Sequence, residues 1–176
     1  MKRKRTHAQI GKGSKEKGAG YERKIAKILN DYMTCLGWGE ASRTPRSGGW
    51  AKASNDPELR KLRGDITLPG ACPFMVETKK REGWSLDQVF RAGLETWEPY
   101  KWFVEGAAKA KHAEKLPVLV FSRNHVPDLV MISGEDAPAL VGAVPKDAVS
   151  VGGMLILLLD TFLEAFAAQV VNAQSS

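Results

Sequence analysis

The sequence predicts a mixed α/β domain in which helices flank a central sheet of about five strands. First, a chain of 176 residues that is 43% hydrophobic and 26% charged is long enough for one domain with a substantial core. Second, apolar residues recur at helical spacing near both ends, whereas short apolar runs bounded by turn residues lie between them. Third, the elements follow the order helix, three strands, helix, two strands, helix.

The chain begins with residues 1–17, which are rich in Lys, Arg, Gly and Ser and lack periodicity. We expect them to form a disordered basic arm and residues 18–172 to form the folded domain. Residues 20–36 are amphipathic and predict a helix that ends at Gly37. The apolar positions of this helix are Ile25, Ile28, Leu29, Tyr32 and Met33.

Three strands are predicted next, over residues 41–44, 64–70 and 74–80. A Pro-Gly turn closes the second strand, so the second and third strands form an antiparallel hairpin. A long polar segment separates the first two strands, and long loops inside compact domains often carry function.

The second half of the chain predicts one or two helices over residues 83–112, broken near Pro99. Two buried strands follow, over residues 117–122 and 128–133, and then a loop-like stretch. Residues 154–159 predict a last strand or the start of a helix, and the pattern from Thr161 to Glu164 is that of a capping box before a C-terminal helix.

Charge is distributed unevenly. The net charge is +6, but residues 1–81 carry +11 and residues 82–176 carry −5. A basic half indicates a face that meets a polyanion, with nucleic acid as the first candidate.

Several classes of protein are excluded. The two cysteines have no paired spacing and no Cys/His cluster, which excludes a zinc finger and a disulfide scaffold. No apolar run follows the basic N-terminus, and no segment is long and apolar enough to span a bilayer. We therefore expect a soluble, cytoplasmic protein.

Three residues on the predicted hairpin could carry chemistry. Glu77 and Lys79 are two apart in a strand, so their side chains share one face of the sheet. The hairpin can bring Asp65 beside Glu77. Two carboxylates side by side repel each other unless a cation lies between them, and their hard oxygens suit Mg²⁺ or Mn²⁺. Such a set can cleave a phosphodiester, although a Glu-x-Lys pattern on a solvent-facing strand is common by itself.

The motif Asp65…Glu77-Thr-Lys79 resembles that of the PD-(D/E)xK nucleases, with Gly64 in place of the usual proline. The helix that carries Glu22 is similar to the first helix of the archaeal-type and phage-encoded Holliday-junction resolvases. The Arg-Thr-Pro-Arg-Ser-Gly-Gly segment that begins at Arg43 resembles a loop of the same family. The resemblance implies a restriction-endonuclease-like sheet and Mg²⁺ as the cofactor, with Mn²⁺ as a substitute.

The resemblance also implies a role for each matching residue. Asp65 and Glu77 would bind the metal directly and Glu22 would assist them, while Lys79 would act on the attacking water or the scissile phosphate. Ser47 would join them near the cut. The residues that would contact the DNA are Arg23, Arg43, Arg46, Lys80 and Arg81. Gln88 is either a further site residue or a plain polar residue of a helix.

Two segments depart from the family. The loop over residues 50–63 is long and basic, and is either a DNA-contacting insertion or a variable loop. The stretch over residues 84–103 is rich in aromatic residues, which suit a core or a dimer interface better than base stacking.

Three functions remain open. The first is a metal-dependent endonuclease that cleaves four-way DNA junctions as a homodimer, in a prokaryotic or phage-infected cell. Two symmetric cuts require two active sites, which predicts a C2 dimer. The others are a different PD-(D/E)xK nuclease, acting in restriction or recombination-repair, and a non-catalytic DNA-binding protein.

Overall fold

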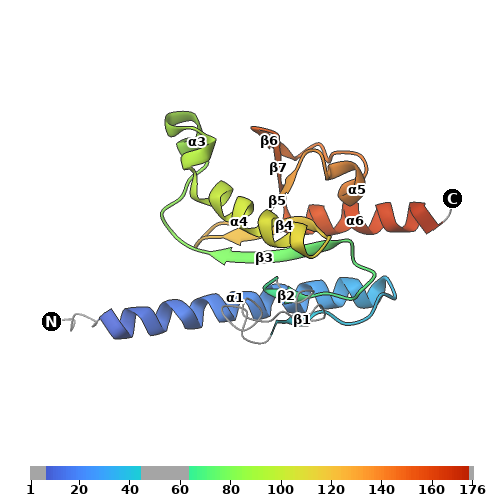
Figure 1. Ribbon diagram of the computed structural model, residues 1–176, viewed down its shortest axis with the longest axis horizontal. Helices are drawn as coiled ribbons and strands as arrows, with labels where there is room; N and C mark the ends of the chain where they lie inside the picture. The colour runs from blue at the N-terminus through green and yellow to red at the C-terminus, as the bar shows by residue number, and fades with distance from the viewer. Residues whose placement is uncertain (1–6, 45–63, 175–176) are drawn as a thin grey trace.

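The computed structural model describes residues 7–44 and 64–174. Its described residues form a seven-stranded mixed sheet in the order β1-β2-β3-β4-β5-β7-β6, with helices on both faces (Figure 1). The predicted α/β class is confirmed. The sheet has more strands than predicted for two reasons. The edge strand β6 has only three residues, too short to give a periodic pattern, and residues 154–158, which the sequence left open between a strand and the start of a helix, form β7.

Helix α1 (His7–Cys35) begins earlier than the amphipathic pattern indicates. Residues 7–17, which we expected to be part of a disordered arm, are helical in the structure. A helix already stabilised by packing extends at little cost through residues such as Lys, Ala and Gln. The predicted end is confirmed, because Gly37 follows with a φ of +71°, which an L side chain rarely adopts.

The predicted hairpin is also confirmed. Strand β1 (Ser42–Arg43) pairs antiparallel with β2 (Ile66–Thr67), and Ile66 of β2 pairs with Val76 of β3 (Phe74–Lys80). The residue before β2 therefore lies next to the carboxyl-terminal half of β3. This register is what brings Asp65 close to the Glu-x-Lys segment.

A helical crossover connects β3 to β4 (Leu116–Ser122), which runs parallel to it. The crossover contains α3 (Asp87–Ala92), a 3-10 turn (Leu94–Thr96) and α4 (Glu98–His112). Pro99 lies in the first turn of α4, so it begins this helix rather than breaking it. In Figure 1, α3 stands away from the sheet, whereas α4 lies against it.

Strand β5 (Leu129–Ser133) pairs antiparallel with β4, as the short loop between them predicts. The stretch that we read as a loop contains helix α5 (Ala137–Val141) and strand β6 (Val149–Val151), both too short to show periodicity. Strand β7 (Met154–Leu158) leads directly into α6 (Leu159–Gln174).

The start of α6 differs from the predicted capping box. The helix begins before Thr161, whose hydroxyl donates to Asp147 Oδ2 at 3.0 Å. The chain passes from β7 into α6 without a break, so Thr161 lies inside the helix and is free to bond to another element.

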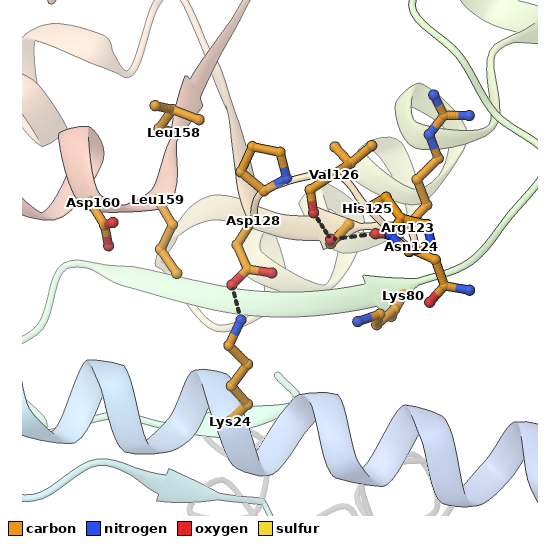
Figure 2. A pocket seen from close by; sticks show the side chains of 12 residues that line it. Lys24, Lys80, Arg123, Asn124, His125, Val126, Asp128, Leu158, Leu159 and Asp160 are labelled. Carbon is orange, nitrogen blue, oxygen red and sulfur yellow. Dashed lines mark hydrogen bonds and ion pairs between the residues drawn. The ribbon is translucent and has the colours of Figure 1, made fainter.

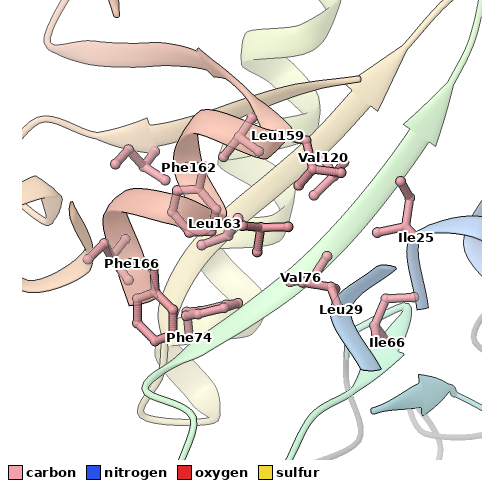
Figure 3. Close-up of a cluster of buried hydrophobic side chains, with 14 of the residues drawn as sticks. Ile25, Leu29, Ile66, Phe74, Val76, Val120, Leu159, Phe162, Leu163 and Phe166 are labelled. Atoms are coloured by element: carbon pink, nitrogen blue, oxygen red, sulfur yellow. The ribbon is translucent and has the colours of Figure 1, made fainter. Parts of the chain in front are cut away.

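Alternation along β3 divides the interior into two apolar clusters, one on each face of the sheet. Phe74 and Val76 of β3 belong to the larger cluster, with side chains of α1 and α6 such as Ile25, Leu29 and Phe162 (Figure 3). The smaller cluster lies on the α4 face. Its buried aromatic residues are Trp84, Trp97, Trp102, Phe103 and Phe121. The aromatic stretch therefore contributes mainly to the core, where Trp97 is only 1% exposed.

None of the helices in the described ranges has a stretch apolar and long enough to cross a lipid bilayer.

Candidate active site

Strand β3 holds the carboxylate of Asp65 in place. Asp65 Oδ2 accepts hydrogen bonds from the backbone N–H of Thr78 at 2.8 Å and from its hydroxyl at 3.3 Å. The backbone N–H of Asp65 donates to the carbonyl of Val76 at 2.9 Å. Asp65 is therefore anchored to β3 through both its main chain and its side chain. The residue is only 9% exposed.

Gly64 explains the departure from the proline of the motif. A Cβ atom at this position would lie 2.7 Å from the carbonyl oxygen of Val76 and 2.8 Å from Met75 Cγ. No larger residue fits without moving β3, since both contacts are shorter than van der Waals distances. The glycine lets the chain approach β3 closely just before Asp65.

Glu77 is the second carboxylate and is 3% exposed. Its Oε2 atom lies 3.8 Å from Nζ of Lys79, so the two side chains share a face as the strand period predicts. Its Oε1 atom is buried and has no hydrogen-bond partner among the described residues. A buried carboxylate oxygen is rarely left unpaired, so this atom is available for a ligand.

Sequence reasoning missed Lys109 of α4. Its Nζ lies 2.8 Å from Glu77 Oε2, closer than that of Lys79. One turn earlier on the same helix face, Gly106 lets α4 approach, since a Cβ there would lie 3.1 Å from Glu77 Cγ. A glycine inside a predicted helix, three residues before a lysine, is the signal that could have identified this contact.

The two carboxylates interact electrostatically. Burial raises the pKa of Glu77, and the charge of Asp65 raises it further, while Lys109 and Lys79 oppose the shift. Two acidic groups pushed together in a partly dry environment favour a bound cation. Hard carboxylate oxygens and an unpaired Glu77 Oε1 fit Mg²⁺ or Mn²⁺.

Glu22 forms an ion pair with Arg43 of β1 in the structure. Within residues 7–44 and 64–174, no three Asp, Glu, His or Cys side chains come close enough together to share one metal ion. The charge of Asp65 acts on Glu77, whereas Glu22 is paired with Arg43.

The remaining predicted site residues are placed as follows. Arg23 and Arg81 are exposed, and Lys80 lies over the ring of Tyr21 at 5.6 Å from its centroid. Arg46, Ser47 and the basic loop over residues 50–63 lie outside the described residues. Gln88 bonds to the backbone of its own turn, accepting from Ser85 N–H at 3.0 Å.

A cleft of about 570 Å³ opens where the parallel strands β3 and β4 end (Figure 2). Lys24, Lys80 and Arg123 line it together with Asn124 and His125. Two acidic residues, Asp128 and Asp160, also line the cleft, and Asp128 forms an ion pair with Lys24. The cleft is moderately basic. One of its lining residues, Lys80, directly follows Lys79 in the sequence.

The class of PD-(D/E)xK nucleases is defined by a mixed sheet with a central parallel strand pair, together with an aspartate before one strand and a Glu-x-Lys pair on the next. The described residues have these features. The chain belongs to the phage putative PDDEXK endonuclease family, whose model matches residues 13–171. No curated protein and no solved structure matches the chain.

Proposed function

We propose that the protein is a Mg²⁺-dependent endodeoxyribonuclease that cleaves four-way DNA junctions as a homodimer. The observation that carries the proposal is that two buried carboxylates and a lysine lie on one hairpin, with Asp65 anchored by Thr78 and Glu77 beside Lys79. Membership of the nuclease family supports phosphodiester hydrolysis of DNA. Junction specificity rests on the resemblance of the first helix and its following loop to resolvases.

Each residue has a proposed task in the hydrolysis. Asp65 and Glu77 hold the metal, and Glu22 assists after release from Arg43. When bound, Mg²⁺ polarises the scissile phosphate and lowers the pKa of a water. Lys79 orients the attacking water and offsets the charge that develops on the phosphate. The cut leaves a 5′-phosphate and a 3′-hydroxyl.

The basic residues have a proposed role in gripping DNA. Lys80 lines the cleft at the end of β3, and Arg23 and Arg81 are exposed. Phosphate contacts of this kind position the duplex without reading its sequence. We assign the same role to Arg43 and Arg46, with Ser47 near the cut.

A homodimer follows from the proposed substrate, because two symmetric cuts need two sites. Apolar side chains suitable for an interface are exposed near the crossover: Phe90 of α3 is 81% exposed and Leu86 is 36% exposed. Light scattering of the purified protein tests the dimer, and Phe90→Glu is expected to shift it toward the monomer. A monomer at micromolar concentration would contradict the symmetric mechanism.

The function is tested by comparing a labelled four-way junction with a linear duplex of the same sequence. Each is incubated with Mg²⁺ or with EDTA, using the natural protein and Asp65→Asn. We expect paired nicks in the junction alone, lost with EDTA and with Asp65→Asn.

Other results would point elsewhere. Equal cutting of the linear duplex would keep the nuclease and discard junction selectivity, favouring a restriction or recombination-repair nuclease. Tight DNA binding without metal-dependent cutting of either substrate would favour a non-catalytic DNA-binding protein.

A further inference from the structure

The charges around Glu77 balance without any metal. Asp65 and Glu77 contribute two negative charges, and Lys79 and Lys109 contribute two positive charges. A divalent ion added to this neutral set would leave a net charge of +2 in a largely buried site. Unbalanced charge in such surroundings is costly, so the divalent ion and the lysine ammonium groups compete for the carboxylates.

Of the two lysines, Lys109 has the closer contact with Glu77. Its Nζ lies 2.8 Å from Glu77 Oε2, within charge-assisted hydrogen-bond distance, whereas Lys79 lies at 3.8 Å. Each side chain keeps roughly a third of its surface exposed, 31% for Lys109 and 27% for Lys79. The Lys109 ammonium therefore has a route to solvent.

Helix α4 packs close enough to β3 to bring Lys109 to Glu77. Gly106 removes the side chain that would otherwise press against Glu77 Cγ at 3.1 Å, and Lys109 follows one turn later on the same face. Lys111, two residues further on, is exposed. The close approach of α4 and the ion pair are two separate features that converge on the same carboxylate.

We propose that Lys109 is a positioning residue that takes the place of the divalent ion's charge at Glu77 in the metal-free protein, and thereby sets the metal affinity. This inference rests on the proposed metal-dependent function. Lys109 stabilises the buried carboxylate while the metal is absent, and its positive charge opposes binding of the metal at the unpaired Glu77 Oε1. Its role differs from that of Lys79, which we assign to the attacking water.

The experiment measures Mn²⁺ binding by the full chain without DNA, from the electron paramagnetic resonance signal of free Mn²⁺. We compare the natural protein with Lys109→Met, Lys109→Arg and the control Lys111→Met. Lys109→Met is expected to bind Mn²⁺ about tenfold more tightly, because its competitor for Glu77 is gone. Lys109→Arg retains the charge and is expected to restore weak binding, and Lys111→Met to leave the affinity unchanged.

Thermal unfolding provides a second measurement. Without metal, Lys109→Met is expected to melt below the natural protein, since Glu77 loses its closest partner, and saturating Mn²⁺ is expected to raise its melting temperature more. If Lys109→Met does not fold without metal, recovery of the folded protein in Mn²⁺ supports the proposal, and failure to recover contradicts it.

The outcomes separate the two proposals. Unchanged or weaker Mn²⁺ binding by Lys109→Met overturns the role of Lys109 while leaving the nuclease intact. If the natural protein binds no Mn²⁺ even with DNA present and cuts no DNA, the proposed function itself fails.

Discussion

Asp65 reaches across the hairpin to accept a hydrogen bond from the backbone N–H of Thr78, at 2.8 Å from its Oδ2. Thr78 lies between the two residues of the Glu-x-Lys pair, so this bond fixes the aspartate relative to both. A carboxylate anchored to the main chain of the neighbouring strand is pre-organised, because its position does not depend on a mobile side chain.

The anchor predicts different outcomes for two substitutions at Asp65. Asn retains an oxygen that accepts the Thr78 N–H, so the melting temperature is expected to stay close to that of the natural protein. Ala leaves this N–H unpaired, which costs about 1–3 kcal/mol of unfolding free energy. Both are expected to lose about 10²–10⁴-fold in cleavage rate, measured in Mg²⁺. Cleavage by Asp65→Asn at the natural rate would remove Asp65 from the site.

Gly64→Ala is expected to destabilise the protein by about 1–3 kcal/mol, measured by urea denaturation. The added Cβ would meet the Val76 carbonyl oxygen at 2.7 Å, so β3 or the turn before Asp65 must shift. Gly70→Ala is the control, because no atom lies within 4 Å of a Cβ placed there. Equal stability of the two variants would contradict the close approach.

Gly106→Ala and Gly18→Ala form a matched pair inside helices. At Gly18 the space is open, so Ala is expected to raise the unfolding free energy by about 0.5–1 kcal/mol through helix propensity. At Gly106 the contact with Glu77 at 3.1 Å opposes that gain. We expect no gain in stability and, since Glu77 is displaced, about a tenfold loss in cleavage rate. A Gly106→Ala protein as stabilised and as active as Gly18→Ala would be inconsistent with this packing.

DNA binding is expected to weaken steeply with salt, because basic side chains displace counterions from phosphates. Lys80→Gln is expected to lower the slope of log affinity against log salt by about one, measured by fluorescence anisotropy with EDTA present. Lys146→Gln serves as the control, since Lys146 is exposed and does not line the cleft. An unchanged slope for Lys80→Gln would exclude Lys80 from phosphate binding.

The two cysteines are expected to react at different rates with a thiol reagent at pH 8. Cys35 is exposed, whereas Cys72 is buried, and burial raises the pKa of its thiol to about 12. The reactive thiolate of Cys72 is therefore scarce in the folded protein. We expect one fast thiol in the native protein, absent in Cys35→Ser, and a second on unfolding in guanidinium. Two fast thiols in the native protein would contradict the burial of Cys72.

Patterns along the sequence were sufficient to predict the long elements and the chemistry on one strand. Helical spacing predicts most of α1, and the run of residues 74–80 predicts β3 with Glu77 and Lys79 on one face. These features are local, because they depend on the geometry of a single helix or strand. The short elements α5 and β6 escaped prediction because three to five residues carry no period and are stabilised by their neighbours.

The contacts between distant segments were decided by the tertiary structure alone. Gly64 is glycine because β3 packs against it, and Lys109 meets Glu77 because α4 crosses over the sheet at Gly106. Glu22 pairs with Arg43 only because α1 lies along β1. Sequence spacing determines which residues share a face of one element, whereas the partner on the next element depends on how the elements pack. The sequence thus predicted the two carboxylates and Lys79, and the packing of α4 added Lys109, which pairs with Glu77.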